Sequence, residues 1–169
     1  MDVSNDNEVL GRRPSKLSTT LQNALTSIHT FIYASTNGAI GGTIVNCPVL
    51  LLTTKGRKTN KQRTIPLLYL ADGDNVVLVA SNGGATKHPT WWLNLQSNPE
   101  AQIQVKGLKQ RVRAEKGSAE EKQRLWPLLT AMYPGYKRYQ EITNRDIPVV
   151  ILRPINDRTD KQRLNVSAT

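Results

Sequence analysis

Residues 49–80 decide the fold, and they read VLLLTTKGRKTNKQRTIPLLYLADGDNVVLVA. Three short runs of aliphatic and β-branched residues lie in this stretch, at 49–54, 64–71 and 76–80. Short apolar runs bounded by turn residues are typical of β-strands, because a helix would repeat its apolar residues at steps of three and four over a longer window. We therefore expect three strands that form an antiparallel meander.

The segments between these strands carry turn residues. Residues 55–62 form a tight polar loop around Gly56. Residues 72–75 read DGDN, in which Asp-Gly is a strong hairpin signal. Both connections are short enough for the strands on either side to be neighbours.

Further runs of the same kind follow along the chain. Runs 101–105 and 108–114 flank Lys106-Gly107, and residues 148–152 supply a sixth run. About six antiparallel strands at short spacing predict a mainly β fold with flanking helices, a closed or partly closed β-barrel. A βαβ sheet would require long helices between the strands.

Three helices are predicted among and between the strands. Residues 88–95 begin with His-Pro, and a proline suits the first turn of a helix. Ser118 and Glu121 form a capping box that opens a second helix, which Pro127 is expected to kink or interrupt. Residues 136–143 predict one more helical segment.

A single domain is predicted at 17–155. Residues 1–16 are polar and lack an apolar period, so we expect a flexible N-terminal arm. In 17–32, apolar residues recur at steps of three and four, which predicts an amphipathic helix. Packing of its apolar face on the core is expected, and contact with a membrane surface is the alternative. Residues 156–169 form a polar C-terminal tail.

The composition limits the class of protein. The 169 residues carry 23 Lys and Arg against 13 Asp and Glu, a formal net charge of +10, which predicts an anionic partner or ligand. Hydrophobic residues make up 38%, too many for a disordered basic chain. With one cysteine, Cys47, and two histidines, neither a disulfide nor a Cys/His metal site is expected. The polar N-terminus resembles no secretory signal, so we expect a cytoplasmic location.

The densest basic run lies in the first polar loop. Lys55, Arg57, Lys58, Lys61 and Arg63 place five cations and no acid within nine residues. A phosphate site needs cations and free backbone amides close together, which a glycine-containing loop offers. A solvated surface loop is the alternative.

A second cluster, at 80–89, reads ASNGGATKHP. Consecutive glycines allow the backbone to approach a ligand closely, and the helix that follows offers unpaired amides to an anion, with Lys87 nearby. The alternative is that Gly83-Gly84 only turns the chain and that His88 only caps the helix. The motif is neither a P-loop nor a dinucleotide fingerprint.

Three tyrosines recur at steps of three, at Tyr133, Tyr136 and Tyr139. On a helical turn their hydroxyls would share one side, which suits a flat aromatic substrate. Core packing or an oligomer surface is the alternative. Since no Ser/His/Asp set or carboxylate pair has a useful spacing, an enzyme with this sequence would take its chemistry from a cofactor.

The order of these motifs resembles one enzyme family. The motifs are PVLLLTTKGRK at 48–58, RTIPLLY at 63–69, VASNGGATKHPTWWLNL at 79–95, YPGY at 133–136, YQ at 139–140 and RDIPVV at 145–150. Together they resemble the deazaflavin-dependent nitroreductases and quinone reductases over about 37–154. The resemblance implies a split β-barrel of the FMN-binding type.

The resemblance also implies an activity, a cofactor and a site. The enzyme would transfer a hydride from reduced coenzyme F-420 to a quinone, a nitroaromatic or an activated alkene. The cofactor would be held by Lys55, Gly56, Arg57, Lys58, Arg63, Thr64, Pro66, Ala80, Ser81, Asn82, Gly83, Gly84, Ala85, Lys87, His88, Pro89, Trp91 and Asn94. The catalytic side would be formed by Tyr69, Ser81, Tyr133, Tyr136 and Tyr139. Tyr69 and Tyr139 are the candidates to hydrogen-bond the acceptor oxygen, and no metal is implied.

Asn82 departs from the pattern, since many relatives carry lysine there. The loss of this cation leaves FMN as an alternative cofactor. A basic nucleic-acid-binding barrel is a third hypothesis, based on the net charge and on Arg111 and Arg113, but the aromatic platform of such barrels is missing and nucleic acid is not expected. We expect a monomer or a homodimer.

Overall fold

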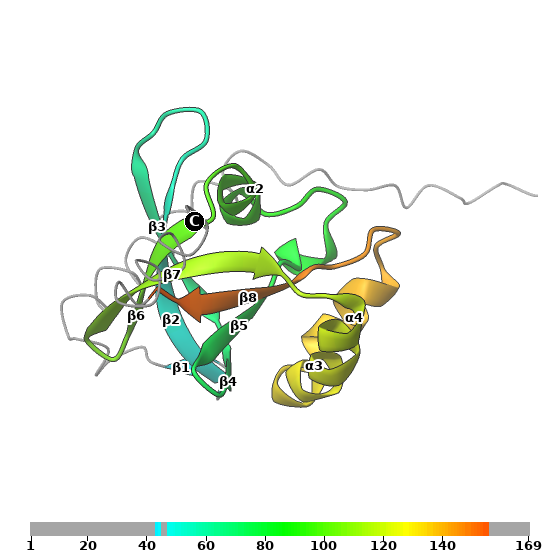
Figure 1. The fold of residues 1–169 in the computed structure, drawn as a ribbon. Helices are drawn as coiled ribbons and strands as arrows, with labels where there is room; N and C mark the ends of the chain where they lie inside the picture. Colours follow the sequence, from blue (N-terminus) through cyan, green and yellow to red (C-terminus); the bar gives the residue numbers. More distant parts are fainter. Residues whose placement is uncertain (1–42, 45–46, 156–169) are drawn as a thin grey trace, which may run out of the picture.

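The computed structural model describes residues 43–44 and 47–155 (Figure 1). The predicted N-terminal arm at 1–16, amphipathic helix at 17–32 and C-terminal tail at 156–169 lie outside the described residues. Within the described part of the chain, no helix is long and apolar enough to cross a membrane.

Eight strands are found in the described residues. They are β1 (Thr43–Ile44), β2 (Cys47–Lys55), β3 (Gln62–Leu68), β4 (Leu70–Asp72), β5 (Asn75–Val79), β6 (Glu100–Val105), β7 (Leu108–Lys116) and β8 (Val149–Pro154). All six predicted runs are strands. The count differs from six because β1 is added and because the run at 64–71 divides at Tyr69 into β3 and β4.

The sheet is antiparallel and has the order β1-β2-β6-β7-β8-β5-β4, with β3 also paired to β2. The pairings expected of the meander are found, because the run at 64–71 pairs with the runs before and after it, but each pairing uses a different half of that run. β3 pairs with β2 and β4 pairs with β5, but the other side of β5 pairs with β8. At the turn between β3 and β4, the amide of Tyr69 donates to the carbonyl of Pro48 at 3.1 Å. One bent segment thus joins two edges of the sheet and closes it into a split barrel.

Successive side chains of β5 and β8 point to opposite faces of the sheet and belong to two separate hydrophobic clusters. Leu78 and Leu152 point to the barrel interior, whereas Val77 and Ile151 point to the opposite face. The interior cluster consists of Leu50, Leu52, Leu78, Ala80, Trp91, Trp92, Leu95, Ile103, Val112, Ala114, Val150 and Leu152. The outer cluster consists of Val77, Val79, Leu125, Leu129, Tyr136, Ile147, Val149 and Ile151.

Three α-helices pack on these clusters (Figure 1). Helix α2 (Thr90–Ser97) contributes two tryptophans and Leu95 to the interior cluster, and α3 (Ala119–Met132) and α4 (Gly135–Glu141) lie side by side over the outer one. The capping box of α3 is confirmed. Of the two effects expected of Pro127, interruption is wrong, because α3 is continuous, and a kink stays a prediction. The full burial of Leu125 and Leu129 on the sheet offsets the cost of proline within the helix.

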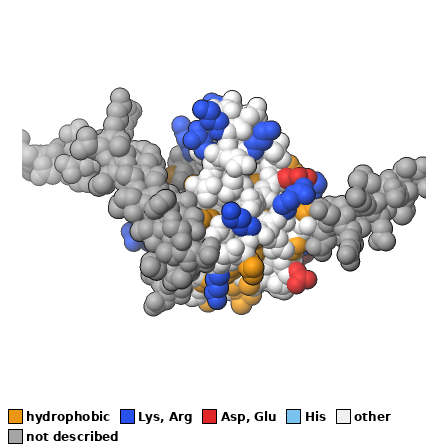
Figure 2. Space-filling view, turned by 90° about the vertical axis from the view of Figure 1, so that its left-hand side faces the viewer, with side chains coloured by type: hydrophobic (Ala, Val, Ile, Leu, Met, Phe, Trp, Pro, Cys, Tyr) orange, Lys and Arg blue, Asp and Glu red, His pale blue; other side chains and the backbone are white. Residues whose placement is uncertain are grey.

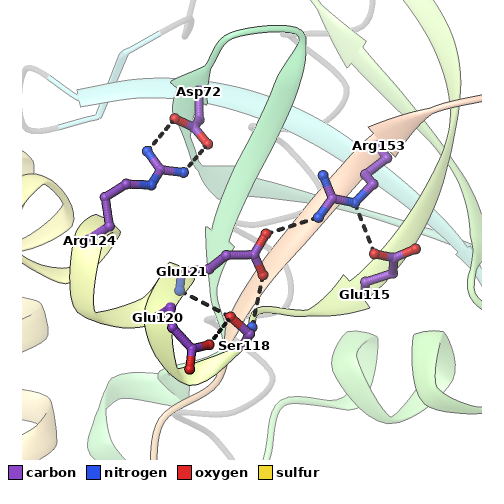
Figure 3. A network of polar contacts seen from close by, with 7 residues as sticks. All are labelled: Asp72, Glu115, Ser118, Glu120, Glu121, Arg124 and Arg153. Carbon is purple, nitrogen blue, oxygen red and sulfur yellow. Dashed lines mark hydrogen bonds and ion pairs between the residues drawn. The ribbon is translucent and has the colours of Figure 1, made fainter.

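Ion pairs attach α3 to the sheet (Figure 3). Arg124 donates two hydrogen bonds to the Asp72 carboxylate, at 2.8 and 2.7 Å, and these hold the pKa of Asp72 below its usual value. Arg153 of β8 donates to Glu115 of β7 and to Glu121 of α3, both at 2.9 Å. The network fixes the start of α3 against β4, β7 and β8.

Candidate functional site

The basic loop joins β2 to β3 and rises above the barrel, and Figure 2 shows Lys and Arg side chains gathered at this end. The amide of Gly56 donates to the Lys61 carbonyl at 2.9 Å, and the amides of Thr59 and Asn60 donate to the Gly56 carbonyl at 3.2 and 2.7 Å. The expectation of a loop rich in free amides is therefore wrong. The hydrogen bonds of the loop shape it, and its charge comes from side chains.

Asn94 of α2 fixes this loop from below. The side chain is buried, with 3% of its residue surface exposed. Its Oδ1 accepts from the Arg57 amide at 3.2 Å, and its Nδ2 donates to Thr54 Oγ1, also at 3.2 Å. Both ends of the amide are used, so Asn94 connects β2, the basic loop and α2.

A cavity of about 240 Å³ lies between the loop and the start of α2. Its lining consists of Gly56, Arg57, Lys58, Thr59, Arg63, Thr90 and Asn94. The lining contains three cations, and no acid occurs among the described residues that form it. The N-terminal end of α2 adds its partial positive charge, so the cavity suits an anion.

A second cavity, of about 260 Å³, lies in the split between β3 and β5. Its lining consists of Pro66, Leu67, Leu68, Leu78, Val79, Ser81, Gly83, Tyr133, Tyr136 and Tyr139. Pro66 lacks an amide proton and so cannot donate to a further strand at this edge. The cavity has apolar walls on the strand side and hydroxyl groups on the helix side.

The three tyrosines form one aromatic cluster. The hydroxyls of Tyr133 and Tyr139 are 3.1 Å apart, and the ring centroids of Tyr133 and Tyr136 are 5.0 Å apart. The hydrogen bond to Tyr139 raises the pKa of Tyr133, and burial raises the pKa of Tyr136. Both phenols therefore stay protonated near neutral pH and keep a proton that can be donated in a hydrogen bond.

The glycine-rich segment joins β5 to α2 through a short 3₁₀ turn at Asn82–Gly84. Asn82 adopts a φ of 49°, which asparagine tolerates better than most residues, and its Nδ2 donates to the Lys87 carbonyl at 2.9 Å. Gly84 has a φ of 79° and packs so closely on Ile142 that a Cβ atom would lie 2.6 Å from the Ile142 Cδ1. The segment is thus shaped by contacts within the protein as well as by glycine.

Arg145, the first residue of the RDIPVV motif, belongs to this site although the sequence did not predict it as a site residue. Its guanidinium donates to backbone carbonyls of the glycine-rich segment and lies 3.2 Å from His88 Nδ1. Since arginine only donates, His88 Nδ1 is the acceptor and the imidazole is neutral. Burial and the charge of Arg145 accordingly lower the pKa of His88.

Comparisons with known proteins identify the family. Residues 25–154 match the family model described as F420H(2)-dependent quinone reductase. The chain belongs to this family. It is 40% identical over 132 residues to an F420H(2)-dependent quinone reductase of Mycobacterium tuberculosis, covering 76% of this chain and 89% of the relative.

Two solved structures are similar to this chain in fold and in sequence. One is described as an F420-H2 dependent reductase, with a TM-score of 0.59, 36% identity and coverage of 63% of this chain and 94% of the other. Another, described as a domain-swapped dimer, has a TM-score of 0.60, 30% identity and coverage of 81% of this chain and 96% of the other. The mainly β split barrel is therefore the fold of the family as well as of this chain.

Most of the residues that the resemblance singled out fall into three groups. Gly56, Arg57, Lys58, Arg63 and Asn94 line the anion cavity. Pro66, Ser81, Gly83, Tyr133, Tyr136 and Tyr139 line the tyrosine cavity. Ala80, Asn82, Gly84, Ala85, Lys87, His88, Pro89 and Trp91 lie in or beside the segment that joins the two cavities, where Ala80, Gly84, Pro89 and Trp91 are buried.

Three further residues lie apart from these cavities. Tyr69 packs against the interior cluster and is not in the lining of the tyrosine cavity. Thr64 Oγ1 is 2.8 Å from Thr53 Oγ1. Lys55 lines a different cavity, which it shares with Gln102.

Proposed function

We propose that this protein is an oxidoreductase that transfers a hydride from reduced coenzyme F-420 to a quinone. The observation that carries the proposal is the position of Ser81. It belongs to the glycine-rich segment that leads toward the anion cavity, and it also lines the tyrosine cavity. A cofactor and an acceptor held on either side of this segment would meet at Ser81.

The anion cavity fits the phosphate and carboxylate groups of F-420. Arg57, Lys58 and Arg63 provide positive charge, and guanidinium groups bind phosphate through paired hydrogen bonds. Asn94 keeps the Arg57 backbone in place. The reduced deazaflavin, when bound, supplies the hydride. In this proposal, the glycine-rich segment from Ala80 to Pro89 borders the ring and the phosphate.

The tyrosine cavity fits the acceptor. When one of the two hydroxyls of Tyr133 and Tyr139 donates to the other, the second keeps a proton that can be donated to an acceptor oxygen. That donation stabilises the negative charge that develops on the oxygen during reduction. Leu67 and Leu68 contribute apolar lining that suits the ring of an aromatic acceptor. Tyr136 and Ser81 complete the polar side, whereas a role for Tyr69 stays a prediction without support from the cavity lining.

A quinone is proposed as the principal acceptor, and nitroaromatics and activated alkenes as further ones. All three are electron-poor and carry oxygen atoms or double bonds that gain negative charge on hydride transfer. The apolar strand side of the cavity has no group that selects among them. Membrane contact through residues 17–32 and a cytoplasmic location stay predictions.

The test is a binding titration with F-420 and FMN in parallel, followed by turnover with menadione. We expect quenching of F-420 fluorescence at lower concentration than any FMN response, and F-420-dependent reduction of menadione. Lys58→Ala should weaken F-420 binding. Lys109→Ala removes an equal charge at an exposed position of β7 and should not weaken it. Tight FMN binding without F-420 binding would replace the proposal by the FMN alternative.

A further inference from the structure

Arg145 lies in the loop between α4 and β8 and outside the linings of both cavities of the site. Its Nε donates to the Ala85 carbonyl at 2.8 Å, and its Nη2 donates to the Ser81 carbonyl at 2.5 Å and to the Ala80 carbonyl at 3.2 Å. One guanidinium therefore holds both ends of the turn formed by Asn82, Gly83 and Gly84. These contacts span 60 to 65 residues in sequence.

Arg145 is itself held by the helix that carries the tyrosines. Gln140 Nε2 donates to the Arg145 carbonyl at 2.9 Å, and Gln140 Oε1 accepts from the Ile147 amide at 3.0 Å. Gln140 follows Tyr139 directly in α4. The backbone of Arg145 is thus fixed to the same helix that places Tyr139 in the cavity.

We propose that Arg145 is a positioning residue that sets the distance between Ser81 and the hydroxyls of Tyr133 and Tyr139. The inference rests on the proposed function, in which the acceptor lies between these groups. Arg145 contacts neither cavity directly and acts through the backbone of the glycine-rich segment.

The physical reason lies in the carbonyl dipoles. Three carbonyl oxygens converge on one guanidinium, and without this cation they would repel one another. Gly83 and Gly84 offer little conformational resistance, so the segment would relax once the cation is removed. The ammonium group of lysine carries the same charge but cannot direct its hydrogen bonds as the planar guanidinium does. Lysine therefore does not restore the conformation of the glycine-rich segment in full.

The main test compares Arg145→Ala and Arg145→Lys with Arg124→Ala. Arg124 forms a two-bond ion pair with Asp72, and neither residue lines the anion cavity or the tyrosine cavity, so its loss removes the same charge and two hydrogen bonds outside the site. We expect Arg145→Ala to lower kcat/KM for menadione by about a hundredfold, the effect of a misplacement of about 1 Å. The loss should lie mainly in kcat. Arg145→Lys should be intermediate, and Arg124→Ala should resemble the wild type.

Chemical rescue provides a second readout. Millimolar guanidinium ion should restore part of the turnover of Arg145→Ala and should not raise that of Arg124→Ala. A purely structural loss would lower the unfolding temperature of both arginine variants and would not respond to the ion. Equal turnover of Arg145→Ala and Arg124→Ala would overturn the proposal.

Amide hydrogen exchange tests the same claim in the protein without cofactor. The amides of Gly84 and Ala85 donate to the carbonyls of Ser81 and Asn82 at 3.0 and 3.1 Å. In Arg145→Ala they should exchange about tenfold faster, the scale of hydrogen bonds to a charged group, and in Arg124→Ala they should not. Unchanged exchange would overturn the positioning role. This readout is independent of turnover, so a wild type inactive with menadione would contradict only the proposed function.

Discussion

Gly84→Ala tests whether the glycine-rich segment and α4 are packed as tightly as the structure indicates. An added Cβ would lie 2.6 Å from Ile142 Cδ1 and 3.2 Å from the Tyr139 carbonyl oxygen. Gly84 also has a φ of 79°, which disfavours any residue with a side chain. The substitution therefore combines a backbone cost with a steric one.

Gly73→Ala separates the two costs. Gly73 has a similar φ of 62°, but no atom lies within 4 Å of its added Cβ. The left-handed conformation should lower the free energy of unfolding by about 1–2 kcal/mol at either position. At Gly84, overpacking adds about 1 kcal/mol, the low end of its range, because Ile142 is 62% exposed and its side chain can rotate away. Gly84→Ala should therefore cost about 2–3 kcal/mol.

Urea denaturation followed by tryptophan fluorescence measures both variants. Gly84→Ala should have a lower midpoint than Gly73→Ala at the same slope. Adding Ile142→Ala should recover part of the difference, because it removes the atoms nearest to the new Cβ. Equal midpoints for the two glycine variants, or no recovery in the double variant, would refute the close contact between the segment and α4.

Two further perturbations test the anion cavity and His88. Asn94→Leu should lower the free energy of unfolding by about 1–3 kcal/mol, because it leaves Thr54 Oγ1 and the Arg57 amide without this partner. The same variant should bind F-420 more weakly in a fluorescence titration, and unchanged affinity would show that Asn94 does not hold the loop in its binding form. The pKa of His88 is lowered in the folded protein, so below pH 6.5 the unfolded chain binds more protons than the folded one. The free energy of unfolding therefore decreases as the pH is lowered. Thermal unfolding of His88→Gln should lack this part of the pH dependence, and identical profiles would contradict a neutral His88.

Local sequence signals predicted the individual elements well. The strand runs and the capping box of Ser118 and Glu121 depend on residues close in sequence, and the structure confirms each of them. The predicted interruption of α3 at Pro127 was wrong because the cost of a proline can be read from the helix alone. The burial of Leu125 and Leu129 depends on residues elsewhere in the chain. Packing of α3 on the sheet therefore outweighs the local cost of the proline.

The pairing of the strands could not be predicted from the same signals. The turn at 72–75 fixes β4 against β5, and the loop at 55–62 fixes β2 against β3, but neither says whether the two hairpins pair with each other. The pairing of the two hairpins is decided by β8, which pairs with the other edge of β5 and lies about 75 residues further along the chain. Arg145 was part of a quoted motif, but its role could not be predicted for the same reason, because its partners lie 60 to 65 residues away in sequence.

The positive charge of the chain is distributed in two ways that the sequence does not distinguish. Arg111 and Arg113, which suggested a nucleic-acid surface, both pair with Glu100, at 3.3 and 3.0 Å. Among the described residues, no ion pair is found for the cations of the basic loop, so their charge is not neutralised within the described part of the chain. A charge that is paired within the sheet stabilises the fold weakly, whereas an unpaired cluster beside a cavity attracts a ligand. The structure thus favours a small anionic cofactor at the loop over a polyanion on the barrel face.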